Sequence, residues 1–284
     1  MVESACDALE RLHRTRVELD LGADDERIAS ALDAIATDEI VTDVVVYSDQ
    51  GVVRSLHALG RVHRRLLDVP HVTALRIRSR LLVAEPQTFT NGVIDRIGSL
   101  TRLDVVRPLR VEVEVPVLHP TELGDELGRV VRGLRRRGVS MYAVIPLLMH
   151  LNDEAQQVPA ITSGCRRLGI EVHHLVLAGH PVQCEGAAVH PVPVGRVVDL
   201  GTALRRDGSG RELPRLIVQT ALGECDFGLT GEPLRHGDDG SVAFRLPAGW
   251  LDALREVDPA FRPPDGVTLG PDGRPIVPVH GLTA

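Results

Sequence analysis

The sequence predicts an α/β fold: an open (β/α)6 barrel of the partial TIM type, followed by a Pro/Gly-rich C-terminal extension. Short apolar runs alternate with segments of helical hydrophobic periodicity at a spacing of roughly 30 residues, which is typical of parallel β/α units. The length of 284 residues is enough for one large core, and 43% hydrophobic and 25% charged residues are typical of a globular protein. We expect the barrel at residues 1–227 and the extension at residues 228–284.

Each expected strand precedes a helix in which apolar residues recur every three to four positions. The expected strands are residues 16–21, 43–47, 71–82, 109–117, 139–148 and 170–178. The expected helices are residues 24–40, 52–67, 90–100, 121–137 and 154–168. Asp24 and Thr90 are suitable N-caps, and Gly169 is a suitable helix end. A further helix at 191–205 and a late strand at 214–221 follow.

The extension is rich in Gly, Pro and Asp, which is typical of turns. A strand at 241–246 and a helix at 248–257 would bring six apolar side chains together. These are Val242, Phe244, Leu246, Trp250, Leu251 and Leu254. We expect this cluster to cover the chain's own barrel.

Three expected strands carry charged residues at alternate positions, so that the charges share one face of each strand. They are Glu18 and Asp20, then Arg76, Arg78 and Arg80, then Arg110, Glu112 and Glu114. The opposite faces are apolar and suit helix packing, so the charged faces are expected to point into the barrel lumen. Buried charge is costly unless it is paired. Two interpretations remain: an Arg–Glu network that fills the lumen, or a polar pocket for a zwitterionic or anionic ligand.

Composition disfavours several classes of protein. A formal net charge of −7 disfavours a nucleic-acid partner. The basic run 135–137 suits the solvated end of a predicted helix, and we favour this interpretation over a phosphate-binding patch. No segment approaches the roughly 20 apolar residues of a membrane span, and the N-terminus lacks the apolar core of a signal peptide. Four scattered cysteines form no CxxC pair, so neither a zinc knuckle nor a disulfide framework is indicated. We expect a cytoplasmic protein with neither a nucleic-acid nor a membrane partner.

Three blocks in the middle of the chain carry a resemblance to a known family. They are LRIRSRLLVAEPQTFT at 75–90, HPTEL at 119–123 and GVSMYAVIPLLMHLND at 138–153. In these blocks, and more weakly from about residue 16 to residue 221, the chain resembles the lysine 2,3-aminomutase family of the radical S-adenosylmethionine superfamily. The resemblance implies a partial TIM-type barrel and an oligomer. In that family the barrel holds a [4Fe–4S] cluster, S-adenosylmethionine and pyridoxal phosphate.

The chain departs from the family where the family holds its cofactors. The family's CxxxCxxC loop after the first strand is replaced by residues 22–23, and three cysteines in one loop are needed for such a cluster. The family's Gly-Gly-Asp-like turn, which meets S-adenosylmethionine, reads YSDQ at 47–50, and Gln219 stands near the family's substrate-binding Asp. The chain contains no lysine, and arginine cannot form the pyridoxal Schiff base. We expect neither an iron–sulfur cluster nor covalently bound pyridoxal phosphate.

We expect ligand-binding residues in the lumen and at its rim, and we assign no catalytic residue. The candidates are Arg78, Arg80, Glu112, Glu114, His119, Glu122, Asn152, Asp153, His173 and His180. His119 and Glu122 match the family's His-Pro-x-Glu turn, and residues 152–153 match the loop after its fifth strand. We also expect Arg78 or Arg80 within salt-bridge reach of Glu112 or Glu114.

Histidines near the sixth strand offer two further interpretations. His173 and His174 are expected on opposite faces of the strand, so one of them would join His119 and a lumen glutamate. Two or three histidines with a carboxylate can bind a metal ion, but we favour barrel-wall histidines and assign no metal. Cys184 or Cys225 with His180 or His190 as base is a weaker, nucleophilic alternative.

The leading functional hypothesis is a catalytically degenerate aminomutase homologue. It would act as a non-catalytic subunit, partner or small-molecule-binding protein in amino-acid or natural-product metabolism, as a homo-oligomer or with an active relative. The alternative is an enzyme that uses the barrel mouth for cluster-independent chemistry, metal-assisted or not, on an amino-acid-like substrate. Mutually saturated lumen charges would favour the first hypothesis, and an open pocket with unpaired groups the second.

Overall fold

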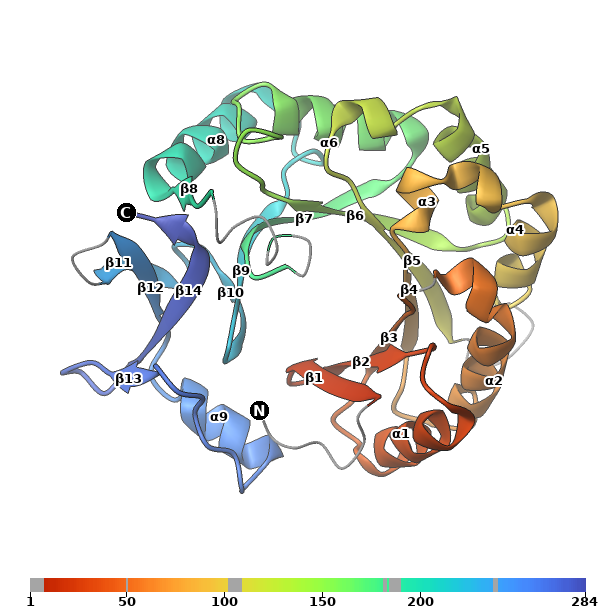
Figure 1. The fold of residues 1–284 in the computed structure, drawn as a ribbon, viewed down its shortest axis with the longest axis horizontal. Coiled ribbons are helices and arrows are strands. Elements are labelled where there is room, and N and C mark those ends of the chain that lie inside the picture. Colours follow the sequence, from red (N-terminus) through yellow and green to blue (C-terminus); the bar gives the residue numbers. More distant parts are fainter. Residues whose placement is uncertain (1–7, 50, 102–108, 181–182, 184–189, 237–239) are drawn as a thin grey trace.

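The computed structural model describes residues 8–49, 51–101, 109–180, 183, 190–236 and 240–284. Within these residues a nine-stranded sheet curls into a barrel, with β1 and β10 at its two edges (Figure 1). Its parallel strands are β2 (Arg16–Asp20), β3 (Asp43–Tyr47), β4 (Ala74–Arg78), β5 (Arg110–Pro116), β6 (Ser140–Pro146), β7 (Glu171–Ala178) and β9 (Arg215–Thr220). The antiparallel edge strands are β1 (Leu9–His13) and β10 (Gly223–Asp226). The architecture confirms the predicted α/β, partial TIM-type class.

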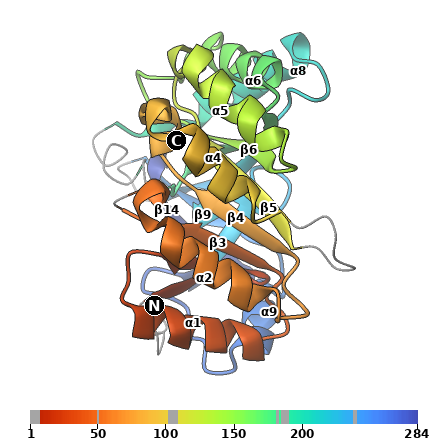
Figure 2. The same ribbon diagram turned by 90° about the vertical axis from the view of Figure 1, so that its right-hand side faces the viewer.

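Helices cover the outer face of this sheet, and Figure 2 shows α1, α2, α4, α5 and α6 along one side of the molecule. The helices are α1 (Asp25–Thr37), α2 (Leu56–Leu66), α4 (Asn91–Gly98), α5 (Asp125–Arg135), α6 (Gln157–Leu168) and α8 (Val194–Asp207). Shorter turns are α3 (Leu81–Ala84), η1 (Val52–Ser55), η2 (Pro86–Thr88) and η3 (Pro120–Glu122). The predicted helix ends are confirmed: Asp24 and Thr90 accept backbone hydrogen bonds as N-caps, and Gly169 takes φ +84° after α6.

The outward side chains of the parallel strands form the main core with the inner faces of these helices. Val44, Leu75, Val113 and Leu175 are almost fully buried in it. Within the described ranges, no helix is long and apolar enough to cross a membrane.

Two predicted element boundaries and the number of parallel strands need correction. The strand predicted at 71–82 ends at Arg78, because Leu81 begins α3 and its apolar residues pack into the core as one helical turn. Arg80 is therefore outside the strand and exposed. The helix predicted from 121 begins only at Asp125, after the turn η3 and the N-cap Gly124. The late strand β9 pairs in parallel with β7, so the sheet has one parallel strand more than a (β/α)6 barrel.

The C-terminal part forms a second sheet that packs on the barrel. It contains β11 (Glu232–His236), β12 (Ser241–Arg245), β13 (Thr268–Leu269) and β14 (Pro275–Thr283), with α9 (Trp250–Val257) beside it. Strand β8 (Val192–Pro193), from within the barrel region, pairs in parallel with β14. The Trp250 indole nitrogen donates a hydrogen bond to the Leu222 carbonyl at 2.9 Å, and Phe244 is buried in the same core as the barrel helices. The apolar cluster of the extension thus covers this barrel.

Candidate functional site

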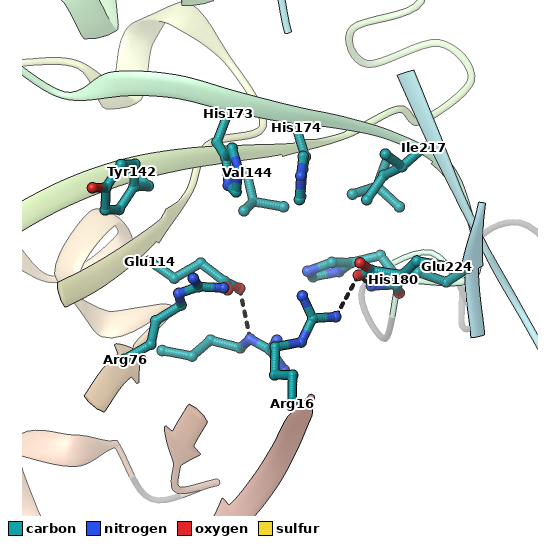
Figure 3. A pocket seen from close by; sticks show the side chains of 13 residues that line it. Arg16, Arg76, Glu114, Tyr142, Val144, His173, His174, His180, Ile217 and Glu224 are labelled. Carbon is teal, nitrogen blue, oxygen red and sulfur yellow. Dashed lines mark hydrogen bonds and ion pairs between the residues drawn. The ribbon is translucent and has the colours of Figure 1, made fainter. Parts of the chain in front are cut away.

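The candidate site is the lumen of the barrel, where alternate residues of the strands point inward (Figure 3). The pocket is lined by Arg16, Arg76, Arg78, Glu114, Tyr142, Val144, His173, His174, Val176, His180, Ile217, Gln219 and Glu224. Val144, Val176 and Ile217 form a small apolar cluster there, separate from the main core. The side chains leave about 10 Å³ free, about enough for one water molecule.

Arg78 lies at the centre of the charged network. Its guanidinium binds both carboxylate oxygens of Glu18 at 2.6 Å, and its Nε donates to Glu114 Oε1 at 2.6 Å. The predicted ion pair between Arg78 and Glu114 is therefore confirmed. Burial of Glu114 would raise its pKa, but the charge and hydrogen bond of Arg78 outweigh burial and hold the pKa at about 2. Glu18 and Glu114 are both only 5% exposed, so this network is an internal one.

A second group of charges lies on the same face, toward the amino ends of the strands. Arg76 donates from Nε to Glu112 Oε2 at 3.0 Å. Arg110 reaches the other oxygen of Glu112 at 2.9 Å, but Arg110 itself is exposed at the start of β5. Glu112 is therefore buried between two arginines rather than directed at a free space.

An ion pair joins the two edges of the sheet. Arg16 on β2 donates to Glu224 on β10 at 2.6 Å, and Gln219 on β9 donates to the same carboxylate oxygen at 3.2 Å. Burial would raise the pKa of Glu224, but Arg16 keeps it below its ordinary value. β1 also contacts β10, so this pair links the two ends of the curled sheet, whose edge strands, within the described residues, are not hydrogen-bonded to each other. The sheet therefore stays open, as the sequence predicts. Gln219, near the family's substrate-binding position, here holds Glu224.

Both neighbouring histidines of β7 face the lumen, so the prediction that they alternate is wrong. The register pairs Val172 with Ala143 and His174 with Val144, which leaves His173 as an extra residue in a β-bulge. The bulge turns both imidazoles inward, and their ring centroids lie 3.7 Å apart at an interplanar angle of 20°. His174 Nε2 is buried and has no hydrogen-bond partner among the residues that the structure describes.

These histidines are neutral near pH 7. Burial lowers the pKa of His174 to about 4, and a charge on the stacked His173 would lower it further. Burial likewise lowers the pKa of His173. His180, also buried, has its pKa lowered to about 4, mainly by burial and against the attraction of Glu114.

The predicted rim residues bind the backbone rather than the lumen. Glu122 accepts hydrogen bonds from the Leu118 and His119 amides, and His119 caps η3. Asn152 donates to two carbonyls at 2.9 Å, and Asp153 accepts from an amide at 2.8 Å. These residues therefore shape the loops after β5 and β6, and His119 does not join the lumen glutamates.

Of the candidates, four line the lumen pocket: Arg78, Glu114, His173 and His180. Glu112 is paired on the same sheet face, whereas Arg80, His119, Glu122, Asn152 and Asp153 do not line it. Sequence reasoning missed Arg16, Tyr142 and Glu224. The sequence could have indicated Arg16, because this residue lies two positions before Glu18 on the same face of one strand. Glu224 carried no such signal, because the short edge strand β10 has no distinctive pattern.

The described residues do not fit the family's cofactors. Residues 21–24, between β2 and α1, contain no cysteine. Cys165 lies on α6 and Cys225 on β10, so neither lies in that loop, and burial raises the thiol pKa of each to about 12. Cys6 and Cys184 lie outside the described residues. No group of three or more His, Cys, Asp or Glu in the described part is arranged to hold a metal ion, and the chain has no lysine for pyridoxal phosphate.

The fold and the lumen define a class: an α/β partial TIM-type barrel with a charged interior. The chain is 25% identical over 191 residues to the L-lysine 2,3-aminomutase of Haemophilus influenzae, covering 67% of this chain and 54% of that protein. It is 25% identical over 201 residues to the L-lysine 2,3-aminomutase of Clostridium subterminale, covering 70% of this chain and 45% of that protein. It is 27% identical over 222 residues to the L-lysine 2,3-aminomutase of Fusobacterium nucleatum, covering 74% of this chain and 48% of that protein.

The chain is therefore related to the lysine 2,3-aminomutases. It spans about half the length of the curated relatives it matches. No protein-family profile matches the chain.

Proposed function

We propose that this protein is an aminomutase-like barrel that does not perform the aminomutase reaction. It acts as a non-catalytic subunit, partner or small-molecule-binding protein in amino-acid or natural-product metabolism. The single observation that carries the proposal is the ion-pair network that fills the lumen, in which Arg78 bridges Glu18 and Glu114. A substrate placed there would have to break buried ion pairs, because only about 10 Å³ is free.

The absence of both cofactors is part of the same proposal. A [4Fe–4S] cluster needs cysteine thiolates near one another, and the two described cysteines are buried on different elements, α6 and β10. A pyridoxal aldimine needs a primary amine, and the chain offers no lysine side chain.

The proposed partner is a second copy of this chain or an active relative. Two large apolar side chains of the C-terminal part support a contact surface: Leu229 is 82% exposed and Leu269 is 63% exposed. Light scattering at tens of micromolar tests self-association, and a strictly monomeric mass would remove the homo-oligomer.

The reaction itself is tested by anaerobic reconstitution with iron, sulfide and pyridoxal phosphate. L-lysine, S-adenosylmethionine and a reductant are then added, with a lysine 2,3-aminomutase treated in parallel as the positive control. We expect no retained cluster and no conversion of lysine. About four irons per chain after desalting, together with formation of β-lysine, would overturn the proposal.

A second candidate function rests on the histidine pair. Buried neutral imidazoles with strongly lowered pKa, beside Tyr142 and Glu224 in one pocket, are typical of acid–base sites. In this alternative the lumen opens and His174 moves a proton on an amino-acid-like substrate. Incubation with a mixture of amino acids, followed by mass spectrometry, tests it: a product made by the parent and lost in His174→Gln would favour the enzyme over the binding protein.

A further inference from the structure

A second pocket, with a volume of about 530 Å³, lies at the amino ends of β5, β6 and β7. Arg110 at the start of β5 lines it, together with Arg132 and Arg135 of α5 and Arg136 at the C-cap of that helix. Among the described lining residues, Glu171 supplies the one carboxylate. Four arginines, one from a strand and three from a helix end, thus line one open pocket.

Among the residues that the structure describes, three of these guanidinium groups have no anionic partner. Within the described part of the chain, Arg132, Arg135 and Arg136 form no salt bridge, whereas Arg110 is bound to Glu112. Two arginines at other helix ends are paired: Arg206 of α8 binds Asp207 at 2.6 Å, and Arg166 of α6 lies 3.6 Å from Glu212. The pocket therefore has a local excess of positive charge on a chain whose net charge is −7.

Backbone geometry makes room for these side chains. Gly169 lines the pocket at φ +84°, and a Cβ at this position would collide with the guanidinium of Arg135. The guanidinium of Arg110 lies over the Tyr142 ring, 5.5 Å from its centroid. Tyr142 lines both this pocket and the lumen, so the two sites share one wall.

We infer that this pocket binds a small ligand that carries two adjacent phosphate groups. A guanidinium binds phosphate oxygens with two parallel hydrogen bonds, so the three arginines of α5 and its C-cap, with Arg110 beside them, suit the oxygens of a diphosphate. The volume lies in the range of small-ligand pockets. Favourable interaction with the end of α5 accounts for arginines in its last turn, but not for Arg110, which comes from a strand.

The predicted run 135–137 lies at the end of α5, where Arg135 is the last helical residue and Arg136 the C-cap, and both are exposed. Arg137 binds Asp95 and the Gly133 carbonyl, away from the pocket. Arg135 and Arg136 line the pocket instead. The inference does not depend on the function proposed for the lumen, because it uses none of the lumen ion pairs.

Titration calorimetry with inorganic pyrophosphate, at constant ionic strength, tests the inference. We expect saturable binding of one pyrophosphate per chain, tighter than that of orthophosphate or sulfate. The double variant Arg135→Gln/Arg136→Gln should bind about tenfold more weakly or worse, since it loses two charge-assisted contacts. The matched control is Arg64→Gln, which changes an exposed arginine in the last turn of α2 and should bind like the parent.

The inference fails if pyrophosphate shows no saturable binding, or if the double variant and the control weaken it equally. Equal affinities for pyrophosphate and orthophosphate would overturn the assignment of a diphosphate. Thermal unfolding of each variant confirms that it is folded, and ATP in place of pyrophosphate tells a nucleotide from the free anion.

Discussion

The lumen and the pocket at the amino ends of the strands are both lined by arginine, yet they differ in the pairing of these arginines and in their free volume. In the lumen, Arg16, Arg76 and Arg78 each have a carboxylate oxygen within 3.0 Å, and about 10 Å³ is free. In the outer pocket, Arg135 and Arg136 have no carboxylate partner among the described residues, and about 530 Å³ is open.

The difference follows from desolvation. A guanidinium inside the barrel loses its water and must be neutralised by a carboxylate, so its partner is part of the fold. At the surface water solvates the charge, and no such partner is required. Paired arginines in the lumen are therefore structural, while convergent unpaired arginines at the surface are available to a ligand.

The largest expected effect is the loss of Arg78. Arg78→Met removes the cation that neutralises two buried carboxylates, and we expect the free energy of unfolding to fall by about 3–5 kcal/mol. Urea denaturation measures it. Arg245→Met, which breaks the exposed pair with Glu232, is the control and should cost about 0–1 kcal/mol. Equal effects of the two variants would mean that the lumen is not a desolvated interior.

Acid should destabilise the lumen next. The native pKa of His174 and of His180 is about 4, below the unfolded value of 6.5, so the unfolded chain binds more protons between these values. Stability present at pH 7 is thus lost as pH falls toward 4, by about 3 kcal/mol for each of the two histidines. The free energy of unfolding measured as a function of pH checks this. The charges of Arg16, Arg215 and Glu224 also act on the pKa of His174.

Matched variants identify the histidine responsible. His174→Gln should remove about half of the pH dependence between about pH 6.5 and 4, because His180 still contributes the other half. His57→Gln, at an exposed position on α2, should leave the pH dependence unchanged. A parent protein whose stability is constant over that range would show that these imidazoles are solvated.

The seam of the barrel should contribute less. Arg16→Met removes the contact with Glu224, whose side chain is 15% exposed, and should cost about 2 kcal/mol. Amide exchange in β1 and β10 should accelerate more than exchange in β5. Arg215→Met is the control, because its pair with Asp226 lies within the β9–β10 hairpin and does not cross the seam. Unchanged exchange at both edges in Arg16→Met would contradict the role of this pair in linking the two ends of the sheet.

The outer pocket should show the smallest effect on stability. Arg135→Gln/Arg136→Gln removes no ion pair, so we expect the free energy of unfolding to stay within about 0.5 kcal/mol of the parent. Urea denaturation in the absence of phosphate measures this free energy. A loss as large as that of Arg78→Met would mean that these arginines support the fold, and the contrast between the two regions would disappear.

Prediction from the sequence was reliable for residues whose partners lie within the same helix or turn. Asp24, Thr90 and Gly169 end their helices as predicted, because capping depends on residues at most four positions away. The pair Arg78–Glu114 was also predictable, because adjacent parallel strands place facing residues at a known spacing. Prediction failed at His173, where strict alternation was assumed and a bulge inserts one residue.

The sequence by itself determined the alternation of strands and helices and the charged inner faces of the strands, because both follow from the period of apolar residues along the chain. Only the tertiary structure decided which charges meet. Arg16 and Glu224 are 208 positions apart and become partners only when the sheet curls until its edges touch. The arginines of the outer pocket come from β5 and α5, and they converge only through the packing of that helix on the sheet. Contacts of this kind depend on distances between elements, which no local pattern encodes.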